Sequence, residues 1–283
     1  MSSLFFKTIG SKNLCFLFAE GLEPGLISSL LKKFMATFRQ RVLKREILKG
    51  TFINLGSPIT VEIAGKAGFD WLLIDLEHGV GDHETLVHQL QAIGNTNAEP
   101  FVRIAANETP RYKRVLDLGA RGVMVPWVSN MEEANLAVSS MRYPPQGIRG
   151  VASLNRACQF GQDFDNYYAT ANEELVTVAQ IETVEAVENA GAMAAIDGID
   201  VLFVGPTDLT TNYGISRQFD HPTYRDAVAK VNAACISAGK AAGILLANTG
   251  QIKQAQEDGF TFIAVGSDGG VLANGMKNLV EAF

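Results

Sequence analysis

The stretch GFDWLLIDLEHG, residues 68–79, places a continuous apolar run directly before a group of ionisable residues. Its apolar part, residues 71–74, has the near-continuous hydrophobicity of a parallel strand that is buried on both faces. Asp75, Glu77 and His78 follow at once. We interpret the stretch as a buried parallel strand whose carboxyl end carries polar, chemically useful side chains.

The same pattern recurs along the chain from residue 38 onward. Short runs of apolar and β-branched residues alternate with amphipathic stretches, and each pair covers roughly 25 to 35 residues, which is the rhythm of repeated βα units. We predict eight strands, over residues 51–55, 71–75, 99–104, 122–126, 176–181, 201–204, 241–244 and 262–265. Eight such units favour a closed (β/α)8 barrel over a doubly wound open sheet. No GxGxxG motif follows a strand and no GxxxxGKS/T motif occurs, so the nucleotide-binding signs of an open sheet are missing.

Three other segments predict local structure. A helix over residues 222–238 is expected to end at Gly239 as its C-cap, and residues 130–133 supply a capping box for a helix that runs through residue 140. A helix over residues 38–48 would close the floor of the barrel. The segment 143–162, rich in Pro and Gly, interrupts the alternation as a long irregular loop, and such loops are usually functional.

Residues 37–283 are expected to form one (β/α)8 domain, because such a barrel uses about 250 residues as a single domain. The first forty-odd residues differ from the rest, being basic and poor in acidic residues. They fit a weak organellar presequence, or a spurious extension ahead of a true start at Met35. In either case we expect residues 1–36 to be poorly ordered.

Composition and charge exclude several classes of protein. Hydrophobic residues make up 47% and charged residues 19%, which is ordinary for a globular protein. The net charge is -6 and the basic residues are dispersed, so we expect no nucleic-acid partner. No apolar run approaches the roughly 20 residues of a membrane span. The cysteines Cys15, Cys158 and Cys235 lack metal-ligand spacing, and we therefore expect a reducing, cytoplasmic setting.

Two carboxylates follow adjacent predicted strands. Glu182 comes after the fifth strand and Asp208 after the sixth. The carboxyl ends of barrel strands lie at one mouth, so the two side chains should lie close together. Such a pair suits a hard cation such as Mg²⁺, which takes oxygen ligands and keeps waters in its shell. The alternative is that each acid only stabilises the N-terminus of the following helix.

His78 is the only one of four histidines that directly follows a predicted strand. Its imidazole titrates near neutral pH, so it could serve as a general base. The alternative is a structural histidine bonded to the backbone. Asp75, three residues earlier, either orients the imidazole ring of His78 or caps the strand.

Arg103 ends a strand that otherwise reads as buried, where an unpaired guanidinium would be costly. The side chain therefore needs an anion beside it. A bound carboxylate or a developing enolate would meet that need, and so would a salt bridge to Asp75 or Glu77.

Five motifs, taken in order, resemble the HpcH/HpaI family of class II aldolases, from about residue 50 to the C-terminus; they lie at residues 68–79, 100–103, 143–150, 180–182 and 205–209. The resemblance implies a TIM barrel of the phosphoenolpyruvate/pyruvate-binding type. It also implies a metal-dependent lyase that reversibly cleaves a 4-hydroxy-2-keto acid, such as 4-hydroxy-2-oxoheptanedioate or a 2-keto-3-deoxy sugar acid. The products would be pyruvate, or a related keto acid, and an aldehyde.

The resemblance further implies a cofactor and an assembly. Glu182 and Asp208 would bind a divalent cation, Mg²⁺, Mn²⁺ or Co²⁺, and Gln180 would line the same site. The cation would act as a Lewis acid on the keto acid, so no Schiff-base lysine is required. Asp117 resembles a position that reaches a neighbouring subunit's site in the family's hexamers, which are trimers of dimers.

Other roles that the resemblance implies concern the substrate. Arg103 would contact the keto acid oxygen and stabilise the enolate. His78, paired with Asp75, would be the acid/base group that moves the proton of the C4 hydroxyl. The backbone around Gly205 and Thr207 would receive the substrate carboxylate.

The sequence also departs from the family pattern near the mouth. Residues 79–82 replace an Ala-Pro-Asn that several members carry, and Trp127 follows the fourth strand, so the identity of the aldehyde stays open. Two alternatives remain: another barrel lyase acting on enolates, such as a citryl or malyl ester lyase or a decarboxylating enzyme like macrophomate synthase, and a catalytically silent barrel that only binds. No basic loop for coenzyme A is evident, which argues against an ester lyase. A catalytically silent barrel would have lost a metal ligand or the base, yet all four of these residues are present: Glu182, Asp208, His78 and Arg103.

Overall fold

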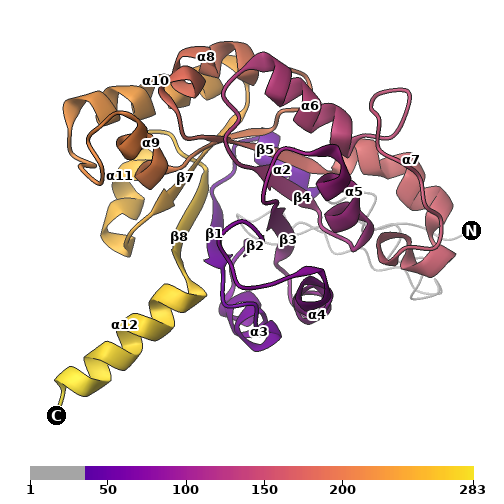
Figure 1. Ribbon diagram of the computed structural model, residues 1–283, viewed down its shortest axis with the longest axis horizontal. Helices are drawn as coiled ribbons and strands as arrows, with labels where there is room; N and C mark the ends of the chain where they lie inside the picture. The colour runs from indigo at the N-terminus through magenta and orange to yellow at the C-terminus, as the bar shows by residue number, and fades with distance from the viewer. Residues whose placement is uncertain (1–35) are drawn as a thin grey trace, which may run out of the picture. The chain divides into compact units, whose positions relative to one another are not determined.

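Eight parallel strands lie at the centre of the protein and close into a barrel (Figure 1). The computed structural model describes residues 36–283, and the expectation for residues 1–36 falls almost wholly outside them. The strands are β1 Leu48–Ile53, β2 Trp71–Asp75, β3 Glu99–Arg103, β4 Gly122–Val125, β5 Val176–Ile181, β6 Val201–Val204, β7 Ala241–Leu246 and β8 Phe262–Ser267. Each strand pairs in parallel with the next, and β8 pairs with β1, so the sheet has no free edge. The predicted (β/α)8 barrel is confirmed.

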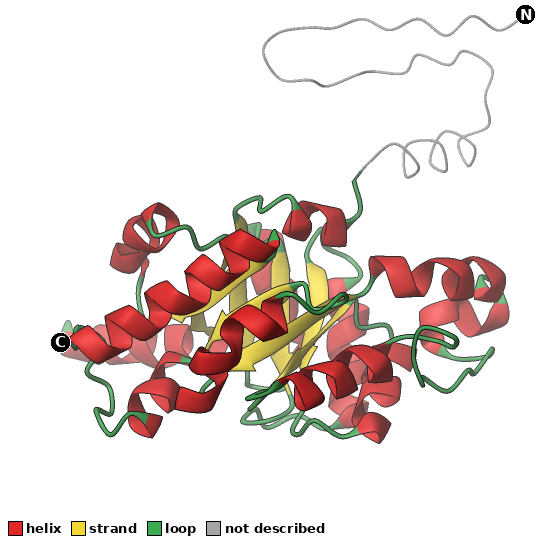
Figure 2. Cartoon of the chain, turned by 90° about the horizontal axis from the view of Figure 1, so that it is seen from above, coloured by secondary structure: helices red, strands yellow, loops and turns green. Residues whose placement is uncertain are grey.

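Helices connect the strands, and most of them cover the outside of the sheet (Figure 2). They are α2 Phe38–Leu43, α3 Pro58–Ala67, α4 His83–Ile93, α5 Thr109–Asp117, α6 Met131–Met141, η1 Arg156–Gly161, α7 Phe164–Glu174, α8 Val184–Ala194, α9 Pro206–Asn212, α10 Pro222–Ala238, η2 Thr249–Gln251, α11 Ile252–Glu257 and α12 Asp268–Glu281. No helix of residues 36–283 is long and apolar enough to cross a membrane.

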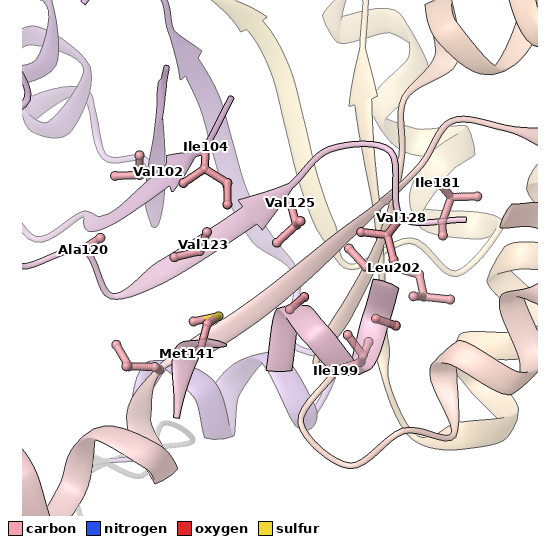
Figure 3. Packing of buried hydrophobic residues seen from close by; sticks show 14 of the residues in the cluster. Val102, Ile104, Ala120, Val123, Val125, Val128, Met141, Ile181, Ile199 and Leu202 are labelled. Atoms are coloured by element: carbon pink, nitrogen blue, oxygen red, sulfur yellow. The ribbon is translucent and has the colours of Figure 1, made fainter. Parts of the chain in front are cut away.

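The core has two layers. Outward-facing strand residues such as Val102, Val125 and Leu202 pack under the helices (Figure 3). Inside the barrel, near the starts of the strands, aromatic rings fill the space, with Trp71 stacked on Phe262 at a centroid distance of 4.0 Å. These rings need room, and glycines on the neighbouring strands supply it. A Cβ atom on Gly50 would lie 2.1 Å from the Trp71 ring.

The predicted helix over residues 38–48 is wrong in its extent, because α2 ends at Leu43 and β1 begins at Leu48. Arg45 adopts a left-handed backbone with φ 57°, which breaks the helix. Its guanidinium donates hydrogen bonds to the carbonyl oxygens of Lys240 and Gly259. Val42 of α2 is fully buried in the aromatic layer, so the helix still covers the floor of the barrel.

The predicted caps are mostly present. Gly239 ends α10 in the left-handed conformation, with φ 67°. The Asn130 side chain accepts the backbone N–H of Glu133, as expected, but the Glu133 carboxylate accepts the N–H of Ser129 instead of that of Asn130. The reciprocal half of the predicted capping box is therefore replaced by a bond one residue earlier. The segment 143–162 is irregular apart from η1.

Candidate active site

The carboxyl ends of four strands bring the predicted site residues to one end of the barrel. Asp75 ends β2, Arg103 ends β3, Glu182 follows β5, and Asp208 lies in the first turn of α9 after β6. The charges of Asp208 and Arg103 both act on Glu182, which places these groups near one another. Most of the predicted set is thus assembled in one place.

Asp75 and Arg103 form a two-pronged ion pair across adjacent strands. They lie opposite each other in the register of β2 and β3. Arg103 donates from Nε to Asp75 Oδ1 at 2.9 Å and from Nη2 to Asp75 Oδ2 at 2.6 Å. Burial opposes ionisation of Asp75, but the hydrogen bonds and charge of Arg103 outweigh it and lower the pKa of this carboxyl. The salt-bridge interpretation of Arg103 is confirmed.

Glu182 is held by a bond to each carboxylate oxygen. Oε1 accepts from Nε2 of Gln180, and Oε2 accepts from the backbone N–H of Trp127, both at 3.0 Å. A Cβ atom on Gly205 would lie 2.5 Å from Oε1, so glycine is required beside the carboxylate. The residue is only 2% exposed. Burial raises the pKa of Glu182 to about 7, and the charges of Asp208 and another carboxylate, Glu77, add to the rise.

The start of α9 carries the other residues predicted for the site, namely Gly205, Thr207 and Asp208. Gly205 is its N-cap and Pro206 occupies the first turn. The N–H of Gly205 donates to the carbonyl of Ile181 at 3.2 Å, so this amide is used by the sheet. The amide of Thr207, in the first turn, has no partner within the helix. Thr207 itself is exposed, and Asp208 is half-buried.

In the turn after β2, His78 is exposed and Glu77 is nearly buried. The His78 side chain is 70% exposed, and its Nε2 lies 3.9 Å from Oε2 of Glu77. In the described part of the chain no hydrogen bond joins the His78 ring to Asp75, which instead binds Arg103 and the backbone N–H groups of Glu77 and His78. Glu77, predicted only as a salt-bridge partner of Arg103, is nearly buried, and its Oε2 lies 2.9 Å from Nη1 of Arg103.

The residues present fit a divalent cation. Glu77 and Glu182 lie near Arg103, which is already paired with Asp75, and the charge of Asp208 acts on both glutamates. The Oε1 atom of Gln180 is buried and, among the described residues, accepts no hydrogen bond. Oxygen donors with excess negative charge are what a hard cation requires. Within residues 36–283 no three Asp, Glu, His or Cys side chains are grouped to hold a metal, so water or substrate would complete the shell of a cation bound by two carboxylates.

Known proteins resemble the chain over most of its length. The profile of the HpcH/HpaI aldolase/citrate lyase family matches residues 48–275. The 5-keto-4-deoxy-D-glucarate aldolase of Enterobacter sp. (strain 638) is 40% identical over 250 residues, covering 88% of this chain and 97% of that protein. The crystal structure of an HpcH/HpaI aldolase/citrate lyase family protein from Burkholderia cenocepacia J2315 is 37% identical with a TM-score of 0.83, covering 86% of this chain and 97% of the other. Macrophomate synthase is 25% identical with a TM-score of 0.76, covering 90% and 96%. With the barrel and the residues at its mouth, these matches show that the chain belongs to the HpcH/HpaI aldolase/citrate lyase family and is an aldolase.

Proposed function

We propose that this aldolase depends on a divalent metal and reversibly cleaves a 4-hydroxy-2-keto acid into pyruvate, or a related keto acid, and an aldehyde. The observation that carries the proposal is the buried Glu182, which lies near Asp208, accepts a hydrogen bond at each oxygen and, among the described residues, forms no salt bridge with a lysine or arginine. Burying this carboxylate is costly unless a positive charge compensates it.

The substrate class follows from chemistry as well as from the relatives. In 5-keto-4-deoxy-D-glucarate, the compound in the name of the Enterobacter protein, numbering from the other carboxyl end places the keto group at C2, the deoxy carbon at C3 and a hydroxyl at C4. That is the 2-keto-3-deoxy sugar acid pattern. We assign a diacid of this kind as the preferred substrate of this chain.

The cation, Mg²⁺, Mn²⁺ or Co²⁺, would be held by Glu182 and Asp208 with Gln180 beside them, and would supply Lewis-acid stabilisation of charge on the keto acid. Arg103 adds positive charge at the same end of the barrel, and Asp75 fixes its direction by two hydrogen bonds. A charged donor aimed at the oxygen where enolate charge develops contributes on the order of 3 kcal/mol.

His78 is proposed as the group that moves the proton. In cleavage, it takes the proton of the C4 hydroxyl, directly or through water, while the C3–C4 bond breaks and its electrons pass to the enolate. In condensation it returns the proton to the new alkoxide. Its exposed ring lies on the turn after β2, open to solvent and to an incoming aldehyde. The amide of Thr207, with the backbone near Gly205, is proposed to receive the substrate carboxylate.

A coupled lactate dehydrogenase assay tests the proposal. Pyruvate release is measured across a panel of 4-hydroxy-2-keto acids, with metal-stripped protein and with added Mg²⁺, Mn²⁺ or Co²⁺. We expect activity only with metal, and EDTA should abolish it. Activity that survives EDTA and is trapped by borohydride would replace the metal mechanism with a Schiff base. Oxaloacetate in the same panel tests the decarboxylating alternative.

We also propose that the enzyme works in the cytoplasm as a homo-oligomer, a hexamer built as a trimer of dimers. The free thiols of Cys158 and Cys235, both buried, suit a reducing compartment. The apolar face of α12, which nothing in the described chain covers, supports assembly with further copies.

A further inference from the structure

The turn that follows β2 holds its side chains in fixed directions. Asp75 Oδ1 accepts hydrogen bonds from the backbone N–H groups of Glu77 and His78, at 3.0 and 3.2 Å. A Cβ atom on Gly79 would lie 2.1 Å from the carbonyl oxygen of Asp75, so only glycine fits there. The turn therefore directs Glu77 inward, with 11% of its side chain exposed, and His78 outward, with 70% exposed.

Glu77 lies near both positively and negatively charged groups. Its Oε2 lies 2.9 Å from Nη1 of Arg103, but the pair is poorly aligned, and this buried oxygen accepts no hydrogen bond from the described residues. The charge of Asp208 acts on Glu77, and that of Glu77 acts on Glu182. Asp75, by contrast, uses both of its oxygens on Arg103. Glu77 is thus the third carboxylate beside the two predicted metal ligands.

We propose that Glu77 is the third acidic group of the cation site, acting by its charge and through water rather than as a ligand; this rests on the metal dependence proposed above. Direct ligation is disfavoured because residues 36–283 contain no group of three Asp, Glu, His or Cys side chains that could hold a metal together. A buried carboxylate oxygen without a hydrogen bond, beside two ligands, is suited to accept from water in the shell of a cation. The same carboxylate contacts Arg103, so it couples the cation site to the group that meets the keto acid.

Binding of Mn²⁺ to the metal-stripped protein, without substrate, tests this role. Free Mn²⁺ is followed by electron paramagnetic resonance for the wild type, Glu77→Gln and Glu77→Asp. We expect Glu77→Gln to bind Mn²⁺ at least tenfold more weakly, since loss of groups that support metal ligands typically costs 10- to 100-fold. Glu77→Asp keeps the charge and should lie between the two. Glu84→Gln removes an exposed carboxylate from the first turn of α4 and should bind like the wild type.

The outcomes separate this inference from the proposed function. A wild type that binds no Mn²⁺ would overturn the metal mechanism itself. Wild-type Mn²⁺ affinity in Glu77→Gln, with a raised KM for the keto acid, would show that Glu77 acts only on Arg103 and would overturn the inference alone. Circular dichroism of each variant checks folding, and if Glu77→Gln fails to fold, Glu77→Asp decides: unchanged Mn²⁺ affinity there contradicts the proposal.

Discussion

At the scale of single residues, Glu182 should make the proposed metal binding depend on pH. Burial, with the nearby carboxylates, raises its pKa to about 7, and a metal ligand must be deprotonated. Below pH 7 the cation therefore competes with a proton, and affinity should fall about tenfold per pH unit, whereas above it the affinity should level off. Mn²⁺ titrations from about pH 5.5 to 8.5 measure this. An affinity that does not change over this range would contradict the assignment of Glu182 as a ligand.

Gly205 should be as necessary to the proposed cation site as Glu182, the carboxylate that it borders. A methyl group there would lie 2.5 Å from Oε1 of Glu182 and would displace it. We expect Gly205→Ala to weaken Mn²⁺ binding tenfold or more, as loss of a supporting contact does, while the fold is retained by circular dichroism. Gly191→Ala on α8 is the matched control, because a Cβ atom there meets nothing within 4 Å. Equal Mn²⁺ affinities in the two variants would refute the steric argument.

The residue types of the site were predictable from sequence, but their pairing was not. Glu182, Asp208 and Arg103 each sit at the end of an apolar run, and the barrel rule places such residues together. Whether Arg103 meets Asp75 depends on the register between β2 and β3, which only packing determines. Glu77 was missed as a site residue because spacing within a turn does not reveal which side chain faces inward.

At the scale of elements, one buried arginine ties the long segment 143–162 to the barrel. The side chain of Arg149 is fully buried. Its Nη2 donates to Oδ1 of Asp117, at the end of α5, at 2.7 Å and to the hydroxyl of Tyr167 on α7 at 3.1 Å. Its guanidinium also lies 4.4 Å from the ring centre of Tyr143. Asp117, predicted to reach a neighbouring subunit's site, is thus the counter-ion of Arg149 within its own chain.

Asp117→Asn should therefore destabilise the fold, because it leaves a buried guanidinium without a counter-ion. We expect the free energy of unfolding to fall by about 3 kcal/mol in urea titrations. Asp197→Asn is the control, since Asp197 pairs with Arg142 at 3.3 Å but is 90% exposed, and such pairs contribute about 0 to 1 kcal/mol. A loss no larger than that of the control would show that Arg149 does not depend on Asp117.

Element boundaries were predictable where the apolar runs were continuous. β5 and β6 were placed to the residue, since both are buried along their whole length. The predicted start of β1, at residue 51, lies three residues after its actual start at Leu48, because Lys49 and Gly50 weaken the strand pattern. Gly50 is needed there for the ring of Trp71, a contact that local sequence does not show.

At the scale of the whole molecule, barrel closure followed from counting units, but the placement of the last helix did not. α12 leads away from the barrel (Figure 1) and has no buried residue. Leu272, Met276 and Leu279 recur along it at helical spacing and are exposed, and the exposed Phe283 follows just after its end. On α3, the helix that follows β1, Ile59 and Ile63 are exposed as well. A second copy of the chain carries the same two exposed apolar surfaces, one on α12 and one on α3. We therefore propose that a second copy covers them.

Charges placed on that face should therefore dissociate the proposed oligomer. We expect the wild type to have a mass well above the 30.5 kDa of one chain in light scattering after size exclusion. The double variant Met276→Glu with Leu279→Glu should elute as a smaller species, because assembly would bury two unpaired carboxylates. Asn274→Glu with Asn278→Glu adds the same charge away from the apolar stripe and should keep the wild-type mass. If the wild type is monomeric, or if both double variants retain its mass, α12 does not hold the copies together.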